Sequence, residues 1–341
     1  MFDNKTILIT GGTGSFGQSF ISYVLKNHSK FKKLIIFSRD ELKQYHLQNK
    51  LSKEKHFEKI RFFIGDVRDL ERLKIATQDV DLIIHAAALK QVPFAEYNPI
   101  ECIKTNVVGA ENIITSAIYN KVAKVIALST DKAASPNNLY GASKLASDKL
   151  FVASNNLSGS KNTIFSVVRY GNVLNSRGSL VPRIIQIKKD KKSFIPITNK
   201  EMTRFIITLD EGVKFVINTF KRMRGGEIFI PKIPSVNICD LALTIAPNIK
   251  QKVIGIRPGE KIHEVMIPID DNHLTYEFKK YYVIKPTIIF SKKINYKIAK
   301  NGEKGKNVDK KFQYTSLINK NFYNKKQIST FIKNINFDEE D

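Results

Sequence analysis

Short apolar segments alternate with amphipathic helical patterns through the first half of the chain, and this alternation limits the possible folds. The predicted strands are rich in Ile, Val and Phe and are apolar throughout, as expected for strands buried on both faces. They span residues 6–10, 34–37, 60–64, 82–85, 125–128 and 165–169. Clear helical patterns lie between them, for example at residues 99–120 and 140–155. This alternation predicts an α/β fold with a doubly wound parallel sheet.

A glycine-rich turn follows the first predicted strand and leads straight into a helical pattern. Its glycines fit both Gly-x-Gly-x-x-Gly and Gly-x-x-Gly-x-x-Gly. Glycine is needed there because the chain must turn tightly, let a pyrophosphate approach its backbone, and pack the helix on the sheet. The free N–H groups at the helix N-terminus would then bind the phosphates. This predicts a Rossmann-type site for a nicotinamide dinucleotide, formed by Gly11, Thr13, Gly14, Ser15, Phe16 and Gly17.

The end of the second predicted strand bears on the choice between NAD and NADP. An acidic residue at this position binds the ribose 2′-hydroxyl of NAD, whereas a basic one accepts the 2′-phosphate of NADP. Ser38 stands about where the acid would be, and Arg39 can pair with a phosphate, so the sequence favours NADP. Asp40 and Glu41 leave an alternative open, because they could cap the next helix instead. Lys43 completes this part of the predicted site.

Further cofactor contacts are predicted after the third and fourth strands. Asp66 can meet the adenine amino group, although capping the next helix is an equal alternative. Small side chains after His85 would let a dinucleotide ribose lie close to the backbone, and His85 itself is expected to be a packed residue. The remaining predicted contacts are Val67, Ala86, Lys90 and Thr105, and no metal ligand is predicted.

Two short motifs in the middle of the chain carry the predicted chemistry. Tyr140 and Lys144 are four residues apart, so on a helix they share one face and the ammonium can lower the pKa of the phenol. Such a Tyr can act as a base near neutral pH. Just upstream, Thr130 is followed by Asp131 and Lys132, a second acid–base couple. Because a plain alcohol oxidation needs only the first set, the second indicates a further proton transfer; an ordinary capping ion pair is the alternative.

Composition limits the class of protein and its surroundings. The 341 residues can bury a large core, and two cysteines are too few for a disulfide framework, so a reducing compartment fits. The sequence shows neither a signal peptide nor an apolar run that could span a bilayer, so a soluble, cytoplasmic protein is expected. The net charge of +24 comes mostly from dispersed lysines, without a nucleic-acid-binding module. We interpret it as surface charge that would also attract anionic substrates.

The pattern changes after Tyr170, where glycine, proline and polar residues interrupt it. We therefore expect a cofactor-binding Rossmann domain over residues 1–170, followed by a smaller, mixed substrate-binding lobe over residues 171–290 that partly interleaves with it. Residues 291–341 are strongly basic and rich in glycine and asparagine, and they are expected to form a peripheral, partly mobile tail with weak structure.

The glycine turn, Thr130 and the Tyr140-x-x-x-Lys144 motif resemble the extended short-chain dehydrogenases/reductases. Blocks at residues 38–43, 63–69, 85–90, 129–133, 169–173 and 257–261 are similar to those of the inverting UDP-N-acetylglucosamine 4,6-dehydratases, and the likeness runs from about residue 6 to 286. Retaining dehydratases carry Asp-Glu after the Thr, whereas here Lys132 takes the second position. The resemblance implies the first step of pseudaminic acid biosynthesis, which supplies sugar for flagellin glycosylation, and a homo-oligomer, often a hexamer.

The same resemblance implies a reaction in which tightly bound NADP⁺ takes a hydride from C4 of the sugar and returns it to C6. Tyr140, helped by Lys144 and Thr130, would remove the C4 hydroxyl proton. The resulting 4-ketone acidifies C5, where Lys132 is assigned as base while Asp131 protonates the departing 6-hydroxyl; the reverse assignment stays open. A proton delivered to the opposite face of C5 gives inversion. This assignment requires a lowered pKa for Lys132 and a raised one for Asp131.

The resemblance also implies which residues hold the nucleotide sugar. Arg204 and Arg257 are the expected partners of the diphosphate, because a guanidinium binds phosphate through two hydrogen bonds; an ordinary ion pair between the lobes is the alternative. Asn199 stands where the family has Asp, which leaves one contact near the sugar open. The full expected set is Lys90, Asn172, Val181, Thr198, Arg204, Arg257 and Glu260.

Other functions remain as alternatives. A retaining dehydratase would share the fold, as would a C4 epimerase or reductase that uses only Tyr140. A dinucleotide-binding regulator or a nucleic-acid-binding scaffold would instead exploit the positive charge. The complete Thr130, Tyr140 and Lys144 set argues against this last class.

Overall fold

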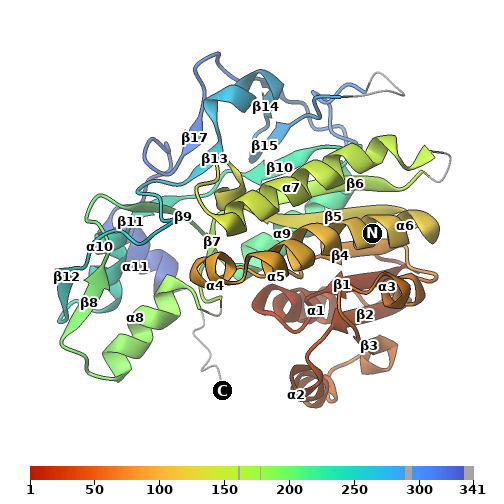
Figure 1. The fold of residues 1–341 in the computed structure, drawn as a ribbon, viewed down its shortest axis with the longest axis horizontal. Coiled ribbons are helices and arrows are strands. Elements are labelled where there is room, and N and C mark those ends of the chain that lie inside the picture. Colours follow the sequence, from red (N-terminus) through yellow and green to blue (C-terminus); the bar gives the residue numbers. More distant parts are fainter. Residues whose placement is uncertain (160–161, 177, 289–293, 334–341) are drawn as a thin grey trace.

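A ten-stranded sheet forms the centre of the computed structural model, which describes residues 1–159, 162–176, 178–288 and 294–333 (Figure 1). The strand order is β16-β14-β15-β10-β6-β5-β4-β1-β2-β3. Neighbouring strands from β3 to β10 are parallel, and the remaining ones are antiparallel. The parallel strands are β1 (Thr6–Thr10), β2 (Lys33–Ser38), β3 (Ile60–Ile64), β4 (Leu82–His85), β5 (Lys124–Thr130), β6 (Ile164–Tyr170) and β10 (Ile228–Pro231).

The predicted α/β fold with a doubly wound parallel sheet is confirmed. The strands predicted at residues 6–10, 60–64 and 82–85 have the same bounds in the structure, and the other predicted strands are longer by one or two residues at each end. Every residue of β1 and β4 is buried. Continuous apolar segments predicted these strands well because strands covered on both faces have no solvent-facing positions.

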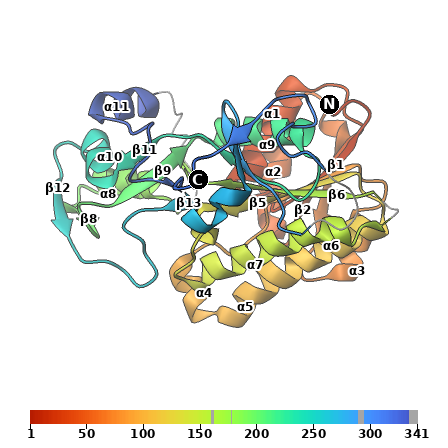
Figure 2. The ribbon, with the colours of Figure 1, turned by 90° about the horizontal axis from the view of Figure 1, so that it is seen from above.

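Helices cover both faces of the parallel strands (Figure 2). On one face α1 (Ser15–Asn27) packs beside α9 (Leu209–Arg222), and on the other lie α3 (Leu70–Ala76), α6 (Gly109–Tyr119) and α7 (Leu139–Ala153). The capping box of Thr208 and Glu211 starts α9, and Val213, Val216 and Phe220 form its buried stripe. Across the described ranges, no helix has the length and hydropathy that crossing a bilayer requires. Two further helices are α2 (Glu41–Leu51) and α4 (Val92–Tyr97).

The helix predicted over residues 99–120 is interrupted in the structure. α5 (Pro99–Ile103) is followed by a π-helical turn (Lys104–Val108) and then by α6. Asn106 stabilises this wider turn, because its side chain bonds both the N–H and the carbonyl of Leu89, at 2.8 and 2.9 Å, and donates to Ser143 at 2.9 Å. Such turns often occur at functional sites, and this one places Thr105 at the cavity described below.

A smaller lobe lies beside the main sheet and has an apolar cluster of its own that includes Ile184, Ile195 and Ile238. After this lobe, the chain adds further strands to the main sheet. The sheet therefore contains strands from both halves of the sequence. The lobe contains α8 (Leu180–Lys189), α10 (Ile238–Ile245), a sheet of β7 (Asn172–Val173), β9 (Thr203–Ile207) and β11 (Ser235–Asn237), and a sheet of β8 (Phe194–Ile197) and β12 (Lys250–Val253). The returning strands are β14 (Thr275–Glu277) and β15 (Tyr281–Ile284).

The C-terminal segment differs from the weakly structured tail that its composition predicts. Within residues 294–333, β16 (Lys306–Asn307) joins the main sheet, β17 (Tyr314–Thr315) pairs with β13 (Val265–Ile267), and α11 (Lys325–Lys333) packs against α10. Tyr314 and Ile328 are buried. Widely spaced apolar residues thus fix the segment, although lysines dominate its composition. Residues 291–293 and 334–341 of the predicted tail lie outside the described residues.

Candidate active site

A cavity of about 800 Å³ opens at the carboxyl ends of the parallel strands. Its wall combines the ends of β1, β2, β4 and β5 with residues of α8 and β8 in the smaller lobe. Ligands of doubly wound sheets bind in this position, and the volume suits a small-molecule site. The residues predicted to hold a cofactor and those predicted to hold a sugar therefore share one space. Three predicted residues lie outside the described cavity wall: Glu41, Asp131 and Val181.

The glycine turn approaches the end of β4 so closely that no side chain would fit. Gly11 has a φ of +66°, and a Cβ placed on it would lie 2.9 Å from the backbone nitrogen of Ala87. The N–H of Gly14 closes the turn on the carbonyl of Gly11 at 2.9 Å. Gly14 is also the N-cap residue of α1, and no side-chain hydrogen bond caps this helix. A phosphate in the cavity can therefore reach the first-turn N–H groups, beside Ser15 and Gly17.

The end of β2 adds polar and cationic groups to the cavity wall. The Oγ of Ser38 lies 2.8 Å from the Oγ1 of Thr13. Asp40 is the N-cap of α2 and accepts a hydrogen bond from the N–H of Lys43 at 2.9 Å, as the capping alternative predicted. The ammonium of Lys43 lies 2.9 Å from the same carboxylate, which places a cation at the wall.

Asp66 is bound by cations and does not cap a helix. Its carboxylate accepts hydrogen bonds from the guanidinium and the N–H of Arg68, at 2.7 and 3.0 Å, and Arg39 lies 3.9 Å away. The cap of α3 is Asp69. Partial burial acts in the opposite direction, but the bonds from Arg68 keep the pKa of Asp66 below its ordinary value. Asp66 is thus an ionised acceptor at the cavity wall, beside Val67.

Polar groups near the ends of β1 and β4 fit a bound dinucleotide. Thr105 is buried at the cavity, and its Oγ1 has no hydrogen-bond partner within the described part of the chain. The Oγ1 of Thr10 accepts the N–H groups of Ala86 and Ala87, both at 3.2 Å. His85 bonds Thr10 at 2.9 Å, and burial lowers its pKa to about 3, so it is a neutral, packed residue. An unpaired hydroxyl beside a wall of alanines suits a ribose.

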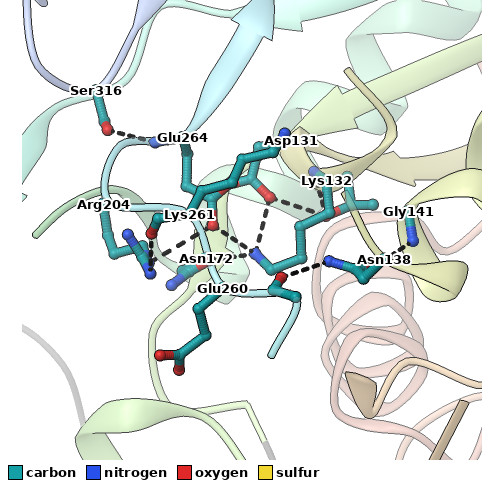
Figure 3. A network of polar contacts seen from close by, with 12 residues as sticks. Asp131, Lys132, Asn138, Gly141, Asn172, Arg204, Glu260, Lys261, Glu264 and Ser316 are labelled. Atoms are coloured by element: carbon teal, nitrogen blue, oxygen red, sulfur yellow. Dashed lines mark hydrogen bonds and ion pairs between the residues drawn. The ribbon is translucent and has the colours of Figure 1, made fainter. Parts of the chain in front are cut away.

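The predicted acid–base couple lies where β5 ends and a 3₁₀ turn (Asp131–Ala133) begins (Figure 3). Thr130 donates to the Oδ1 of Asp131 at 2.9 Å, and the ammonium of Lys132 donates to the same oxygen at 3.1 Å. The ammonium also lies 3.1 Å from the Oε1 of Glu264 and 3.4 Å from the Oδ1 of Asn172. Lys132 therefore bridges two carboxylates, both 2% exposed or less, instead of forming a surface capping pair.

The expected reaction requires a raised pKa for Asp131 and a lowered pKa for Lys132, and the structure meets the first requirement only. Burial, together with the nearby charge of Glu264, raises the pKa of Asp131, as an acid requires. Burial alone would lower the pKa of Lys132, but the carboxylates of Asp131 and Glu264 outweigh it and raise that pKa above its ordinary value. The expected lowering of the pKa of Lys132 is thus wrong. Burial opposes ionisation of Glu264, yet Lys132 and Arg204 keep its pKa low.

Tyr140 and Lys144 lie one turn apart on α7, and both line the cavity. Burial raises the pKa of Tyr140 to about 12, against the opposing effects of Lys132 and of a hydrogen bond with Thr130. The expected lowering of the pKa of Tyr140 by Lys144 is therefore wrong, because burial dominates and Lys132 is the cation that acts on the phenol. Burial also lowers the pKa of Lys144, although Asp148 opposes it.

A buried network fixes α7 behind these side chains. Asp148, one turn beyond Lys144, accepts hydrogen bonds from Ser129 at 2.8 Å and from Arg169 at 3.1 Å. The guanidinium of Arg169 also donates to the carbonyl of Met266 at 2.9 Å. The network joins α7 to β5, β6 and β13, so the face that carries Tyr140 is held against the end of the sheet.

The loop at residues 257–261 is attached to the start of α7 (Figure 3). Asn138 is the N-cap of α7, and its Nδ2 donates to the carbonyl of Gly259 at 2.8 Å. The ammonium of Lys261 donates to the carbonyl of Ala134, next to the 3₁₀ turn, at 2.7 Å. Glu260 accepts from the N–H of Arg257 at 3.2 Å, and both residues line the cavity as predicted.

Some predicted substrate contacts have structural roles. Arg204 is 8% exposed and lines the cavity, but its guanidinium donates to three backbone carbonyls at 2.7–3.0 Å and lies 3.6 Å from Glu264, so it forms an ion pair as the alternative proposed. Val181 is buried in an apolar cluster with Ile206. Asn199 accepts from the N–H of Glu201 at 2.7 Å and thereby caps its own turn. Lys90, Asn172 and Thr198 line the cavity as predicted.

Sequence reasoning missed Glu264 and Lys261. Both line the cavity, and Glu264 contacts Lys132 directly. A signal was present, because Glu264 immediately precedes the apolar residues of β13, where a charged side chain is unexpected unless it has a partner. The contact to Lys132 joins residues far apart in the chain, so no local pattern shows it.

The parallel sheet, the glycine turn and the Tyr140–Lys144 pair on α7 define a Rossmann-type fold of the short-chain dehydrogenase/reductase kind. Residues 7–286 match a family model described as polysaccharide biosynthesis protein. The chain belongs to this family.

Relatives and solved structures agree with this assignment. A UDP-N-acetylglucosamine 4,6-dehydratase (inverting) of Campylobacter jejuni serotype O:2 is 57% identical and covers 93% of each chain. Its counterpart from serotype O:23/36 is 55% identical over 97% of this chain and 98% of the relative. The X-ray structure of Pen from Bacillus thuringiensis has a TM-score of 0.86 and 35% identity, and covers 98% of both chains. The resemblance expected from the sequence blocks is thereby confirmed.

Proposed function

We propose that the protein removes water from UDP-N-acetylglucosamine, with inversion at C5, to form UDP-2-acetamido-2,6-dideoxy-β-L-arabino-hex-4-ulose. The observation that carries this proposal is the placement of Lys132, beside the acid Asp131, in the same cavity as Tyr140 and Lys144. The identity of 55–57% with two enzymes named for this reaction supports it.

Tyr140 and its neighbours would act first, on the C4 hydroxyl. A nicotinamide dinucleotide in the cavity supplies a hydride acceptor that returns the hydride later in the same cycle. The phenolate of Tyr140, which the hydrogen bond with Thr130 and the charge of Lys132 favour, takes the hydroxyl proton, and Lys144 lines the cavity one helical turn away. Because burial holds the pKa of Tyr140 at about 12, the phenolate depends on these neighbours.

Asp131 and Lys132 would then eliminate water across C5 and C6. Asp131 suits the acid, because its pKa is raised and its Oδ1 already accepts two hydrogen bonds, which leaves Oδ2 for the proton. Within the described residues Oδ2 has no hydrogen-bond partner, but Asp131 is buried just behind the cavity wall, so transfer of its proton to the departing 6-hydroxyl requires the carboxyl to turn toward the cavity. Lys132 is the base at C5, and a solvent-derived proton delivered to the opposite face of C5 gives the inversion.

NADP is the cofactor that the residues at the end of β2 favour. Ser38 brings no negative charge to the cavity, and Arg39 and Lys43 both line it, although the carboxylate of Asp40 lies 2.9 Å from Lys43 and leaves Arg39 as the main cation for a 2′-phosphate. The helix N-terminus beside Gly14 would hold the pyrophosphate. Ala86 and Thr105 would face a ribose, and Asp66 the adenine amino group.

Cations near the loop at residues 257–261 would hold the diphosphate of the sugar nucleotide. Arg257, Lys261 and Lys90 line this part of the cavity. Arg204 contributes charge from behind, since its hydrogen bonds go to the backbone. A pathway role in pseudaminic acid synthesis for flagellin or surface glycosylation, a homo-oligomeric assembly such as a hexamer, and a cytoplasmic location remain proposals that rest on the resemblance.

Incubation of the purified protein with UDP-N-acetylglucosamine in deuterium oxide tests the proposal. The expected product has lost one water, carries solvent deuterium at C5 and has the inverted ring. A product of unchanged mass would identify a C4 epimerase, and an unchanged C5 configuration a retaining dehydratase. If no UDP-sugar is turned over and the protein instead shifts DNA in a salt-sensitive way, the nucleic-acid scaffold is favoured.

Lys132→Ala should keep bound NADP but lose turnover and C5 exchange.

A further inference from the structure

Glu264 is a buried carboxylate of the catalytic centre to which the proposed reaction assigns no role. It is 2% exposed and lies just before β13. Its Oε1 is 3.1 Å from the ammonium of Lys132 and 3.6 Å from the guanidinium of Arg204. Its Oε2 is buried without a hydrogen-bond partner within the described ranges.

The backbone on either side of Glu264 holds it in this position. Its N–H donates to the Oγ of Ser316 at 2.8 Å (Figure 3), and its carbonyl accepts from the N–H of the same residue at 2.8 Å. Ser316 also lies 2.7 Å from the hydroxyl of Thr203. The C-terminal segment and β9 together therefore fix a carboxylate beside Lys132. Burying a carboxylate costs free energy, and a residue with a purely structural role would not require this cost.

The proposed base carries a proton that must leave before it can act. An ammonium cannot remove the C5 proton, and the carboxylate of Glu264, 3.1 Å away, favours the ammonium form of Lys132. Asp131 is a poor acceptor for this proton, because its Oδ1 already accepts from Thr130 and its own proton goes to the leaving hydroxyl. Glu264 is the remaining carboxylate in contact with Lys132 among the described residues.

We propose that Glu264 is a positioning residue that accepts a proton from Lys132 and so produces the amine that acts at C5. The inference rests on the proposed function. In this step the Nζ–H bond of Lys132 breaks and an O–H bond forms on Glu264, which converts ammonium and carboxylate into amine and carboxylic acid. The amine then takes the C5 proton, while Asp131 gives its proton to the 6-hydroxyl, which leaves as water. No oxidant or external reactant is needed.

Other charged groups around Lys132 influence the same equilibrium. Arg204 from β9 disfavours the ammonium, and the phenol of Tyr140 faces it from α7. The cation of Lys261 lies close enough to Glu264 and Asp131 to stabilise both carboxylates. Because these groups are unchanged in a Glu264 variant, any altered pH dependence reports on the one carboxylate removed.

The Glu264→Gln variant tests the proposal, because Gln keeps the size and a hydrogen-bonding oxygen but cannot take a proton. We expect kcat near neutral pH to fall by about 10²–10⁴-fold, the range for loss of a general acid–base group. The deficit should shrink as pH rises, since removing the anion lowers the pKa of Lys132 by about 1–3 units and lets solvent take its proton. Glu264→Asp should keep the pH profile of the unsubstituted protein. Glu277→Gln, which removes a carboxylate from an ion pair with Lys232, is the matched control.

A deficit in Glu264→Gln that is equal at all pH values, or no deficit at all, would overturn the proposal. The same holds if Glu264→Asp is as inactive as Glu264→Gln, and this variant decides if the Gln variant does not fold. Lysine Cε signals followed by NMR without substrate, with Lys132 assigned by its loss in Lys132→Ala, should titrate at lower pH in Glu264→Gln. Unchanged titration would also overturn it. Failure of the unsubstituted protein to dehydrate any UDP-sugar would instead overturn the proposed function.

Discussion

Lys132 and Arg39 are both cations of the cavity, but their surroundings give them different capacities. The side chain of Lys132 is 25% exposed and contacts two carboxylates, both at 3.1 Å. The side chain of Arg39 is 58% exposed, and Asp66 lies 3.9 Å from it. A lysine held between carboxylates is suited to the proposed proton transfer, whereas an arginine with an exposed fork of donors can bind an incoming phosphate.

The Arg39→Ala variant is therefore expected to bind NADP more weakly, by about 10-fold to 100-fold, the value of a hydrogen bond between charged groups. The dissociation constant for NAD should change little, since NAD has no 2′-phosphate. Calorimetric titration with both cofactors measures the difference. Arg61→Ala, which removes a guanidinium bound to backbone carbonyls of β3 and its flank, is the control. An equal loss of NAD and NADP affinity would contradict the assignment.

At the residue scale, the sequence predicted best where the chemistry is local. Tyr140 and Lys144 share a helix face, and Thr130 to Lys132 are consecutive. Spacing alone therefore predicted that the members of each set lie together. The charge state of Lys132 depends on Glu264, which the fold brings from a distant segment. Burial likewise decides the pKa of Tyr140, and burial is a property of the packed molecule.

At the element scale, the start of α7 connects helix stability to substrate binding. Asn138 caps this helix and also holds the loop that carries Arg257 and Glu260. Asn138→Ala should cost about 1 kcal/mol of stability through the lost cap. It should also raise KM for the sugar nucleotide, because the loop loses its attachment, with a smaller effect on kcat.

Asp69→Ala provides a matched comparison for this prediction. Asp69 caps α3, which lies away from the loop, and should cost a similar amount of stability while leaving KM unchanged. Denaturant unfolding and steady-state kinetics measure both effects. If Asn138→Ala and Asp69→Ala changed KM equally, the loop would not depend on Asn138 for its position.

The elements that were predicted poorly are those that side-chain contacts define. Buried parallel strands show themselves as apolar segments, and their bounds were predicted within two residues. The π-helical turn in the helix predicted at residues 99–120 follows from the bonds of Asn106 to Leu89 and Ser143, which hydrophobic periodicity does not record. The two-residue strands β16 and β17 are too short to show a pattern of their own.

At the scale of the whole molecule, one sheet runs through both halves of the sequence. β10, β15, β14 and β16 continue the sheet that β1 to β6 begin, and the loop at residues 257–261 closes the cavity from the other side. The division at residues 170 and 290 stays a prediction from composition. Charge belongs to this scale as well, because a net charge of +24 raises the local concentration of any anionic nucleotide around the cavity.

The C-terminal helix offers the sharpest test of how the molecule is held together as a whole. Ile328 on α11 is fully buried in a cluster with Val181, Ile206 and Leu241, which belong to the lobe beside the cavity. Ile328→Ala should therefore lower the free energy of unfolding by about 2–5 kcal/mol, as for other large-to-small core substitutions. Lys326→Ala, on the exposed side of the same helix, should change it by less than about 0.5 kcal/mol. Equal unfolding midpoints for the two variants in denaturant would mean that the segment behaves as the loose tail its composition predicts, and that the lobe does not need it.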